Sequence, residues 1–143
     1  MSELVKGGVL PLFDRLASAL YEHAHGVHLE TMESVQDSIG RELRQLFNTR
    51  SPLSVADYAQ GSGTVLEYGI PDFSSLSAQN ATDLQQLAAV LRQAVQRYEP
   101  RLCDVSVQVS ATPNRHEVAR VRIGAQARAG LALRRVDFEM LLG

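Results

Sequence analysis

The sequence contains one cysteine, no tryptophan and a single lysine, Lys6. One cysteine cannot form an internal disulfide, which excludes the class of small secreted domains held together by disulfides. Cys103 therefore fits a reducing compartment. No run reaches the roughly 18 apolar residues that span a membrane. The N-terminal residues lack the pattern of a signal peptide. These absences predict a soluble protein of the cytoplasmic type.

Formal charge is close to balanced, at −2, but it is unevenly distributed. Residues 1–100 carry −5, with seven basic and twelve acidic side chains, whereas residues 101–143 carry +3, with seven basic and four acidic ones. Thirteen of the 14 basic residues are arginines, whose planar heads make bidentate contacts with carboxylates or phosphates. The division is a weak indication of a partner surface in the C-terminal part, where Arg120 and Arg122 lie.

A length of 143 residues suits one domain with a core of its own. We expect an N-terminal arm over residues 1–30 and a folded domain over 31–143. In the arm, Pro11 can open a short helix whose apolar stripe includes Phe13 and Leu16. So short a helix is marginal alone, so it packs either on its own domain or on another protein.

Apolar residues at helical spacing predict two long helices, over about 30–47 and 81–98. Thr82 and Gln85 have the spacing of a capping box at the start of the second helix. Between the helices, residues 48–80 form a long connection rich in Ser, Gly and Pro, with a helical turn expected near Leu53–Tyr58. A connection of this length is usually functional or braced by its own packing.

After Pro100 the apolar period changes from 3.6 to 2, which predicts three strands, over about 104–110, 119–128 and 131–142. The fold class is therefore α+β: two main helices packed on one face of a three-stranded antiparallel sheet, plus the N-terminal helical arm. The other face of the sheet stays polar. The two sheet edges keep unpaired backbone groups, which invite a strand from a partner.

Motifs for catalysis, metal binding or phosphate binding are absent from the sequence. It has no Gly-x-Ser-x-Gly, no Gly-Lys-Ser/Thr loop and no closely spaced Asp/Glu/His set. The run of His23, His25 and His28 fits a solvated linker better than a zinc or nickel site, because no further ligands lie nearby. An acidic chain without aromatics among its strand arginines does not favour nucleic-acid binding. We expect no metal and no cofactor.

Glu99-Pro100-Arg101 stands at the predicted junction of the second helix and the first strand. A glycosidase acid must hold its proton, usually in an apolar pocket. A guanidinium two residues away favours the ionised carboxylate instead, which disfavours a catalytic role. Two interpretations stay open: the charges brace the corner, or they contact a partner.

Four segments, in this order, carry a resemblance to a known family. They are Leu10-Pro-Leu-Phe-Asp-Arg-Leu16, Ser34–Arg50 with its ending Leu46-Phe-Asn-Thr-Arg50, Tyr68-Gly-Ile-Pro-Asp72 and Glu99-Pro-Arg101. The set resembles the TssE family of baseplate wedge proteins in bacterial type VI secretion systems, within the gene-product-25-like group of contractile-tail baseplates. Phe47 replaces a Leu of the family pattern, and the N-terminal arm favours the secretion branch over phage proteins.

The resemblance implies a structural, non-enzymatic role. In this family the protein joins the TssF/TssG wedge around the spike hub, and it offers a platform on which the TssB/TssC sheath begins to polymerise through exchanged β-strands. Partner contacts are expected at motif residues and strand arginines, namely Leu12, Phe13, Leu16, Tyr68, Pro71, Asp72, Glu99, Pro100, Arg101, Arg120 and Arg122.

Two other hypotheses belong to different classes. A muramidase is suggested by an old lysozyme label of the family and by Glu99, and a peptidoglycan assay would detect it. A regulatory binder resembling the IraD-type anti-adaptors, which share the wider fold group, would instead form a tight complex with a response regulator.

Overall fold

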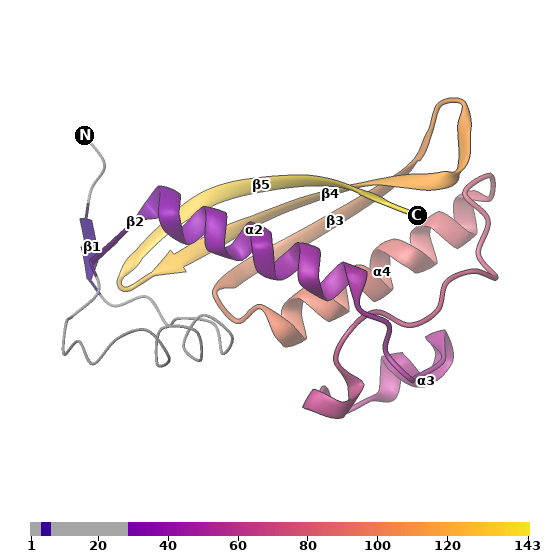
Figure 1. The fold of residues 1–143 in the computed structure, drawn as a ribbon, viewed down its shortest axis with the longest axis horizontal. Coiled ribbons are helices and arrows are strands. Elements are labelled where there is room, and N and C mark those ends of the chain that lie inside the picture. Colours follow the sequence, from indigo (N-terminus) through magenta and orange to yellow (C-terminus); the bar gives the residue numbers. More distant parts are fainter. Residues whose placement is uncertain (1–3, 7–28) are drawn as a thin grey trace.

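The structure is a computed structural model that describes residues 4–6 and 29–143 (Figure 1). A two-stranded sheet precedes three helices, and a three-stranded sheet ends the chain. The elements are β1 (Leu4–Lys6), β2 (Leu29–Thr31), α2 (Met32–Asn48), α3 (Val55–Gln60), the 3-10 turn η1 (Val65–Glu67), α4 (Ala81–Tyr98), β3 (Leu102–Thr112), β4 (Arg115–Ala129) and β5 (Ala132–Leu142). The predicted arm helix and the three histidines lie outside the described residues.

The two long helices begin at residues with good capping side chains. The Thr31 hydroxyl accepts a hydrogen bond from the Ser34 amide at 3.1 Å, at the start of α2. At the start of α4 the cap is Asn80, whose side chain accepts from the Thr82 amide at 2.9 Å. The predicted capping box of Thr82 and Gln85 is therefore wrong. Asn is the stronger N-cap, and it starts the helix two residues earlier.

The three long strands form an antiparallel meander in the order β3-β4-β5, as the alternation predicts. The pairing of β3 with β4 shifts by one residue between Cys103 and Ser106. Asp104, inside this bulge, adopts a left-handed φ of 51°, which Asp tolerates better than most residues. The small β1–β2 sheet was not predicted, because three-residue segments are too short to show a period.

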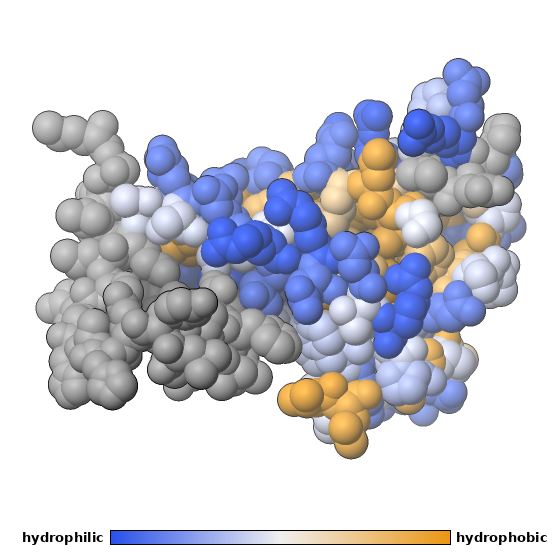
Figure 2. All heavy atoms as spheres, in the orientation of Figure 1, coloured by the Kyte–Doolittle hydropathy of each residue, from blue (hydrophilic) through white to orange (hydrophobic). Residues whose placement is uncertain are grey.

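Both long helices cover the same face of the sheet, so the predicted α+β arrangement is confirmed. Helix α4 contacts β3, whereas α2 contacts β4 and β5. On the side seen in Figure 2, the surface over α2 is mainly hydrophilic. The opposite stripe of α2, with Val35, Ile39 and Leu43, is buried, as the helical period predicts.

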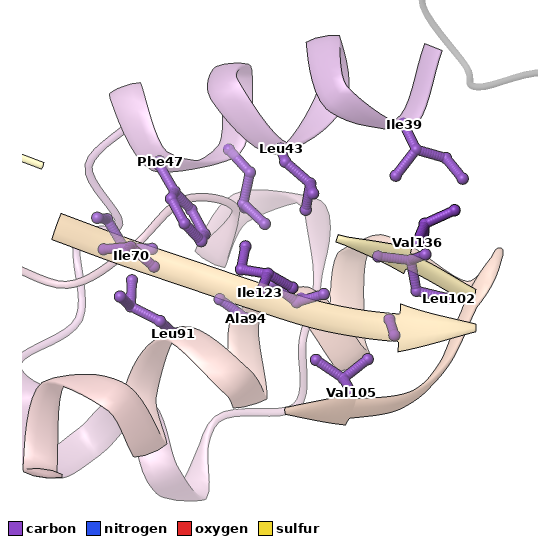
Figure 3. Close-up of a cluster of buried hydrophobic side chains, with 14 of the residues drawn as sticks. Ile39, Leu43, Phe47, Ile70, Leu91, Ala94, Leu102, Val105, Ile123 and Val136 are labelled. Carbon is purple, nitrogen blue, oxygen red and sulfur yellow. The ribbon is translucent and has the colours of Figure 1, made fainter. Parts of the chain in front are cut away.

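The core lies between the helices and the sheet (Figure 3). Alternate residues of β4 from Ala119 to Ala129 are buried, while Arg120, Arg122 and Arg128 between them are exposed. Period-2 alternation therefore separates a dry face from a wet one. No helix among residues 4–6 and 29–143 is both long and apolar enough to cross a membrane.

Candidate protein-interaction site

The corner between α4 and β3 is a buried ion pair. Arg101 Nε lies 2.8 Å from Glu99 Oε1, and Arg101 Nη2 donates to Glu99 Oε2 at 2.9 Å. The chain turns between them, with the Leu102 amide donating to the Glu99 carbonyl at 3.1 Å. Pro100 suits the second position of this turn because its ring fixes φ near the required value. The two-residue spacing thus produces a bidentate pair.

Arg101 also connects the corner to two other elements. Its Nη1 donates to the Ser38 hydroxyl on α2 at 3.1 Å. Its backbone carbonyl accepts from the Arg128 amide on β4 at 2.7 Å. The motif therefore fixes both helices against the sheet, and the bracing interpretation describes its local role.

The same geometry leaves Glu99 poorly suited to acid catalysis. Its side chain is buried, and both carboxylate oxygens accept from Arg101. Of the three motif residues only Pro100 is exposed, so a partner could reach this corner directly only there. Removing either charge would leave the other one buried and unpaired, which is costly.

A second motif folds against the end of α2. The Ile70 amide donates to the Thr49 carbonyl at 3.0 Å, and the Ser51 amide donates to the Ile70 carbonyl at 2.9 Å. Gly69 has a φ of +115°, and a Cβ there would lie 2.6 Å from the Thr49 oxygen, so the position requires glycine. The Tyr58 hydroxyl donates to the Gly69 carbonyl at 2.8 Å. Two segments that are separate in sequence thus form one junction.

Tyr68 connects this junction to the Glu99 corner. Its ring meets that of Tyr98 edge-on, with centroids 5.1 Å apart. Burial, reinforced by the carboxylates of Glu42 and Glu99, raises the pKa of Tyr68 to about 12. The side chain therefore stays a neutral phenol at physiological pH.

The end of the motif opens to solvent. Pro71 is buried, but Asp72 is exposed, and its carboxylate accepts from the Ser74 amide at 2.9 Å and from the Ser74 hydroxyl at 3.0 Å. These bonds lower the pKa of Asp72. Nearby, the Arg50 guanidinium lies 4.7 Å from the centre of the Phe73 ring. Asp72, Arg50 and Phe73 line a hollow of about 530 Å³ that extends to the end of β5.

The strand arginines occupy the outer face of the sheet, away from these two motifs. Glu139 on β5 lies 3.4 Å from Arg120 Nε and 3.3 Å from Arg122 Nη2. All three side chains are about half exposed. They are accessible to a partner, and their attraction is weakened by water.

The structure thus places Tyr68 next to the Glu99–Arg101 corner and buries Pro71 in the same loop as Tyr68, while Arg120 and Arg122 lie on a separate surface. Leu12, Phe13 and Leu16 lie outside the described residues. Sequence reasoning did not single out Ser38, whose role depends on Arg101, 63 residues away. Nor did it single out Thr49 and Arg50 within their motif. Among the described residues, no group of three His, Cys, Asp or Glu side chains could hold a metal ion.

One family model and two solved structures are similar to this chain. A family model described as baseplate wedge protein gp25 matches residues 33–130. A solved structure described as the baseplate complex from the type VI secretion system contains a chain that is 20% identical, with a TM-score of 0.53, over 78% of this chain and 96% of that one. A putative tail lysozyme from Geobacter sulfurreducens is 17% identical over 82% and 97% of the two chains, with a TM-score of 0.46. No curated protein sequence matches.

Proposed function

Since the chain belongs to the family of the baseplate wedge protein gp25, we propose that it is a structural, non-enzymatic subunit of a type VI secretion baseplate in the cytoplasm. The observation that carries the proposal is the family match over residues 33–130, most of the folded domain. The buried, doubly bonded Glu99 supports a role without catalysis, because a general acid must reach its substrate.

In the proposed assembly the protein joins the wedge subunits TssF and TssG next to the spike hub. Contacts are proposed at the accessible positions Pro100, Asp72, Arg120 and Arg122, and at Leu12, Phe13 and Leu16 of the arm. Glu99, Arg101, Tyr68 and Pro71 contribute by holding the corner and the loop in shape, since they are buried or half-buried. The subunit also offers a platform for the TssB/TssC sheath.

The three-stranded sheet suits this second task. Within the described residues β3 and β5 each pair with β4 alone, which leaves one edge of each strand open. An extended segment of a partner could pair with such an edge through main-chain hydrogen bonds.

Co-expression with TssF and TssG from the same genome tests the proposal. We expect the wild-type chain to co-purify with them, and Arg120→Gln with Arg122→Gln to weaken the complex at low salt while the thermal midpoint changes little. Absence of any complex with the wild-type chain would refute the wedge role. Peptidoglycan turnover by the wild-type chain that Glu99→Gln abolishes, in a variant whose circular dichroism shows an intact fold, would establish the muramidase alternative instead.

A further inference from the structure

Two large aliphatic side chains project from the turn η1 into solvent. Val65 is 82% exposed and Leu66 is 86% exposed. In Figure 2 a hydrophobic cluster stands out at the lower edge of the molecule, where Figure 1 draws the segment between α3 and α4. Single exposed aliphatic residues are ordinary, but an adjacent pair at the tip of a turn needs a reason. We call Val65 and Leu66 the aliphatic tip.

The turn that carries the aliphatic tip is held from within its own loop. The Glu67 carboxylate accepts from the Gly63 amide at 2.7 Å and from the Thr64 amide at 3.2 Å. The Glu67 amide in turn donates to the Thr64 carbonyl at 3.0 Å. These bonds fix the backbone on both sides of the two exposed residues.

Helix α4 also holds this loop. Arg97 donates to the carbonyls of Tyr58 at 2.8 Å and Gly61 at 2.6 Å. The Tyr98 hydroxyl donates to the Thr64 carbonyl at 3.1 Å. The backbone that carries the aliphatic tip is therefore held at several points, so little backbone entropy is lost when the tip is bound.

The surroundings of the aliphatic tip indicate what kind of surface covers it. The exposed loop residues before the tip, Ser62 and Thr64, are uncharged, as are Ala59 and Gln60 at the end of α3. The carboxylate of the half-buried Glu67, directly after the tip, accepts hydrogen bonds from the Gly63 and Thr64 amides. Membrane-binding segments combine apolar residues with Lys and Arg, whereas the guanidinium of Arg97 is used on carbonyl oxygens. Two aliphatic side chains also fall far short of the roughly 800 Å² per partner that a stable interface buries, so they do not by themselves hold two copies together.

We propose that the aliphatic tip inserts into an uncharged, apolar pocket on a wedge subunit, as one anchor of a larger interface. The partner's identity rests on the proposed function. The assignment of the tip as an anchor rests on the exposure of its two side chains and on the hydrogen bonds that hold its loop. Leu66 lies two residues before Tyr68, so the tip is carried by the same loop as the junction.

The test measures the affinity of the full chain for the co-purified TssF/TssG complex by titration. We expect Val65→Ser with Leu66→Ser to weaken binding at least tenfold, by the same factor at low and high salt because the pocket is uncharged. Leu66→Met should retain most of the affinity, since it conserves volume and polarity. Leu131→Ser is the matched control, a fully exposed leucine in the turn between β4 and β5 and outside the proposed contact positions, and should bind like the wild type.

Each other outcome identifies what failed. If the wild-type chain binds the wedge complex and the double variant binds equally well, the aliphatic tip is not an anchor, although the proposed function stands. If the wild-type chain does not bind at all, both proposals fail. Dimers of the wild-type chain that the double variant loses in sedimentation would assign the tip to a second copy. Flotation with uncharged vesicles that the double variant loses would assign it to lipid.

Discussion

Within the described residues, an arginine–glutamate contact in the corner and another on the outer sheet face have the same chemistry and opposite surroundings. In the corner, Glu99 is 3% exposed and Arg101 is 8% exposed, and two hydrogen bonds join them. On the outer sheet face, Glu139 lies between Arg120 and Arg122 at 3.3–3.4 Å, with all three side chains about half exposed. The charges of the corner are bound by protein groups in place of water, whereas those of the outer cluster remain accessible to water.

The comparison shows that the effect of an ion pair on stability depends on the surroundings of the charge that remains when its partner is removed. A buried charge that loses its partner has no solvent to replace it, whereas an exposed one is rehydrated. The corner should therefore control folding. The outer cluster should affect contacts with other molecules while adding little to stability.

Removing one charge of the corner is expected to have the largest effect. Arg101→Ala leaves Glu99 buried without its bidentate partner and removes the bond to Ser38. We expect the free energy of unfolding to fall by about 3–5 kcal/mol. Urea unfolding followed by circular dichroism measures it, since the chain has no tryptophan.

A double substitution distinguishes charge from packing at the same corner. Glu99→Leu with Arg101→Met removes both charges and keeps most of the volume, so it should recover most of the stability lost in Arg101→Ala. A loss below about 1 kcal/mol in Arg101→Ala would contradict the contrast between the two groups, because the value would match that of an exposed pair.

Much of the fold could be predicted because it depends on local periodicity. The bounds of α4, Ala81–Tyr98, coincide with the apolar stripe and with the proline that follows. The meander follows from alternation, and both helices must cover its single apolar face. The cap of α4 was missed because Asn80 and Thr82 can both cap a helix, and only the backbone conformation shows that Asn80 does.

The site was less predictable because its contacts join distant parts of the chain. The motifs were visible, yet nothing in the sequence shows that Arg101 reaches Ser38 or that Gly69 lies against the Thr49 carbonyl. Glu99-Pro-Arg101 left bracing and partner contact open, since burial depends on how the helices pack. The exposure of Val65 and Leu66 was equally hidden, because an apolar pair in a loop normally predicts packing.

A buried neutral group that titrates at high pH provides an intermediate case. Burial is the main cause that raises the pKa of Tyr58 from 10.0 to about 12. Between these values the unfolded chain releases the proton while the folded chain retains it, so stability is complete below pH 10 and falls as pH rises toward 12. The loss should be on the order of 2 kcal/mol.

Tyr58→Phe provides the control for this pH dependence. In this variant the stability should decline less between pH 10 and 12. The remaining decline comes from Tyr68, whose pKa is also about 12. Urea midpoints measured from pH 9 to 12 show it. An unchanged slope in the variant would mean that Tyr58 titrates alike in the folded and unfolded chains.

At neutral pH the same variant measures a buried hydrogen bond without charge. Tyr58→Phe removes the bond to the Gly69 carbonyl and leaves that oxygen in the interior. We expect a loss of about 1–2 kcal/mol, smaller than for Arg101→Ala because no ion is stranded. A loss as large as that of Arg101→Ala would indicate that burial alone, rather than buried charge, distinguishes the two regions.

Breaking the outer cluster is expected to have the smallest effect on stability. Glu139→Gln removes the carboxylate that Arg120 and Arg122 share, but water reaches both guanidinium groups. We expect the free energy of unfolding to fall by less than about 1 kcal/mol, and by even less with added salt because exposed charges are screened. Urea unfolding at low and high salt provides the measurement, with Arg128→Gln as a control on the same strand face.

If Glu139→Gln cost as much stability as Arg101→Ala, half exposure would not predict how much an ion pair contributes to stability. If it left unfolding unchanged but altered affinity for the wedge complex, the outer cluster would have the role in contacts that its surroundings suggest.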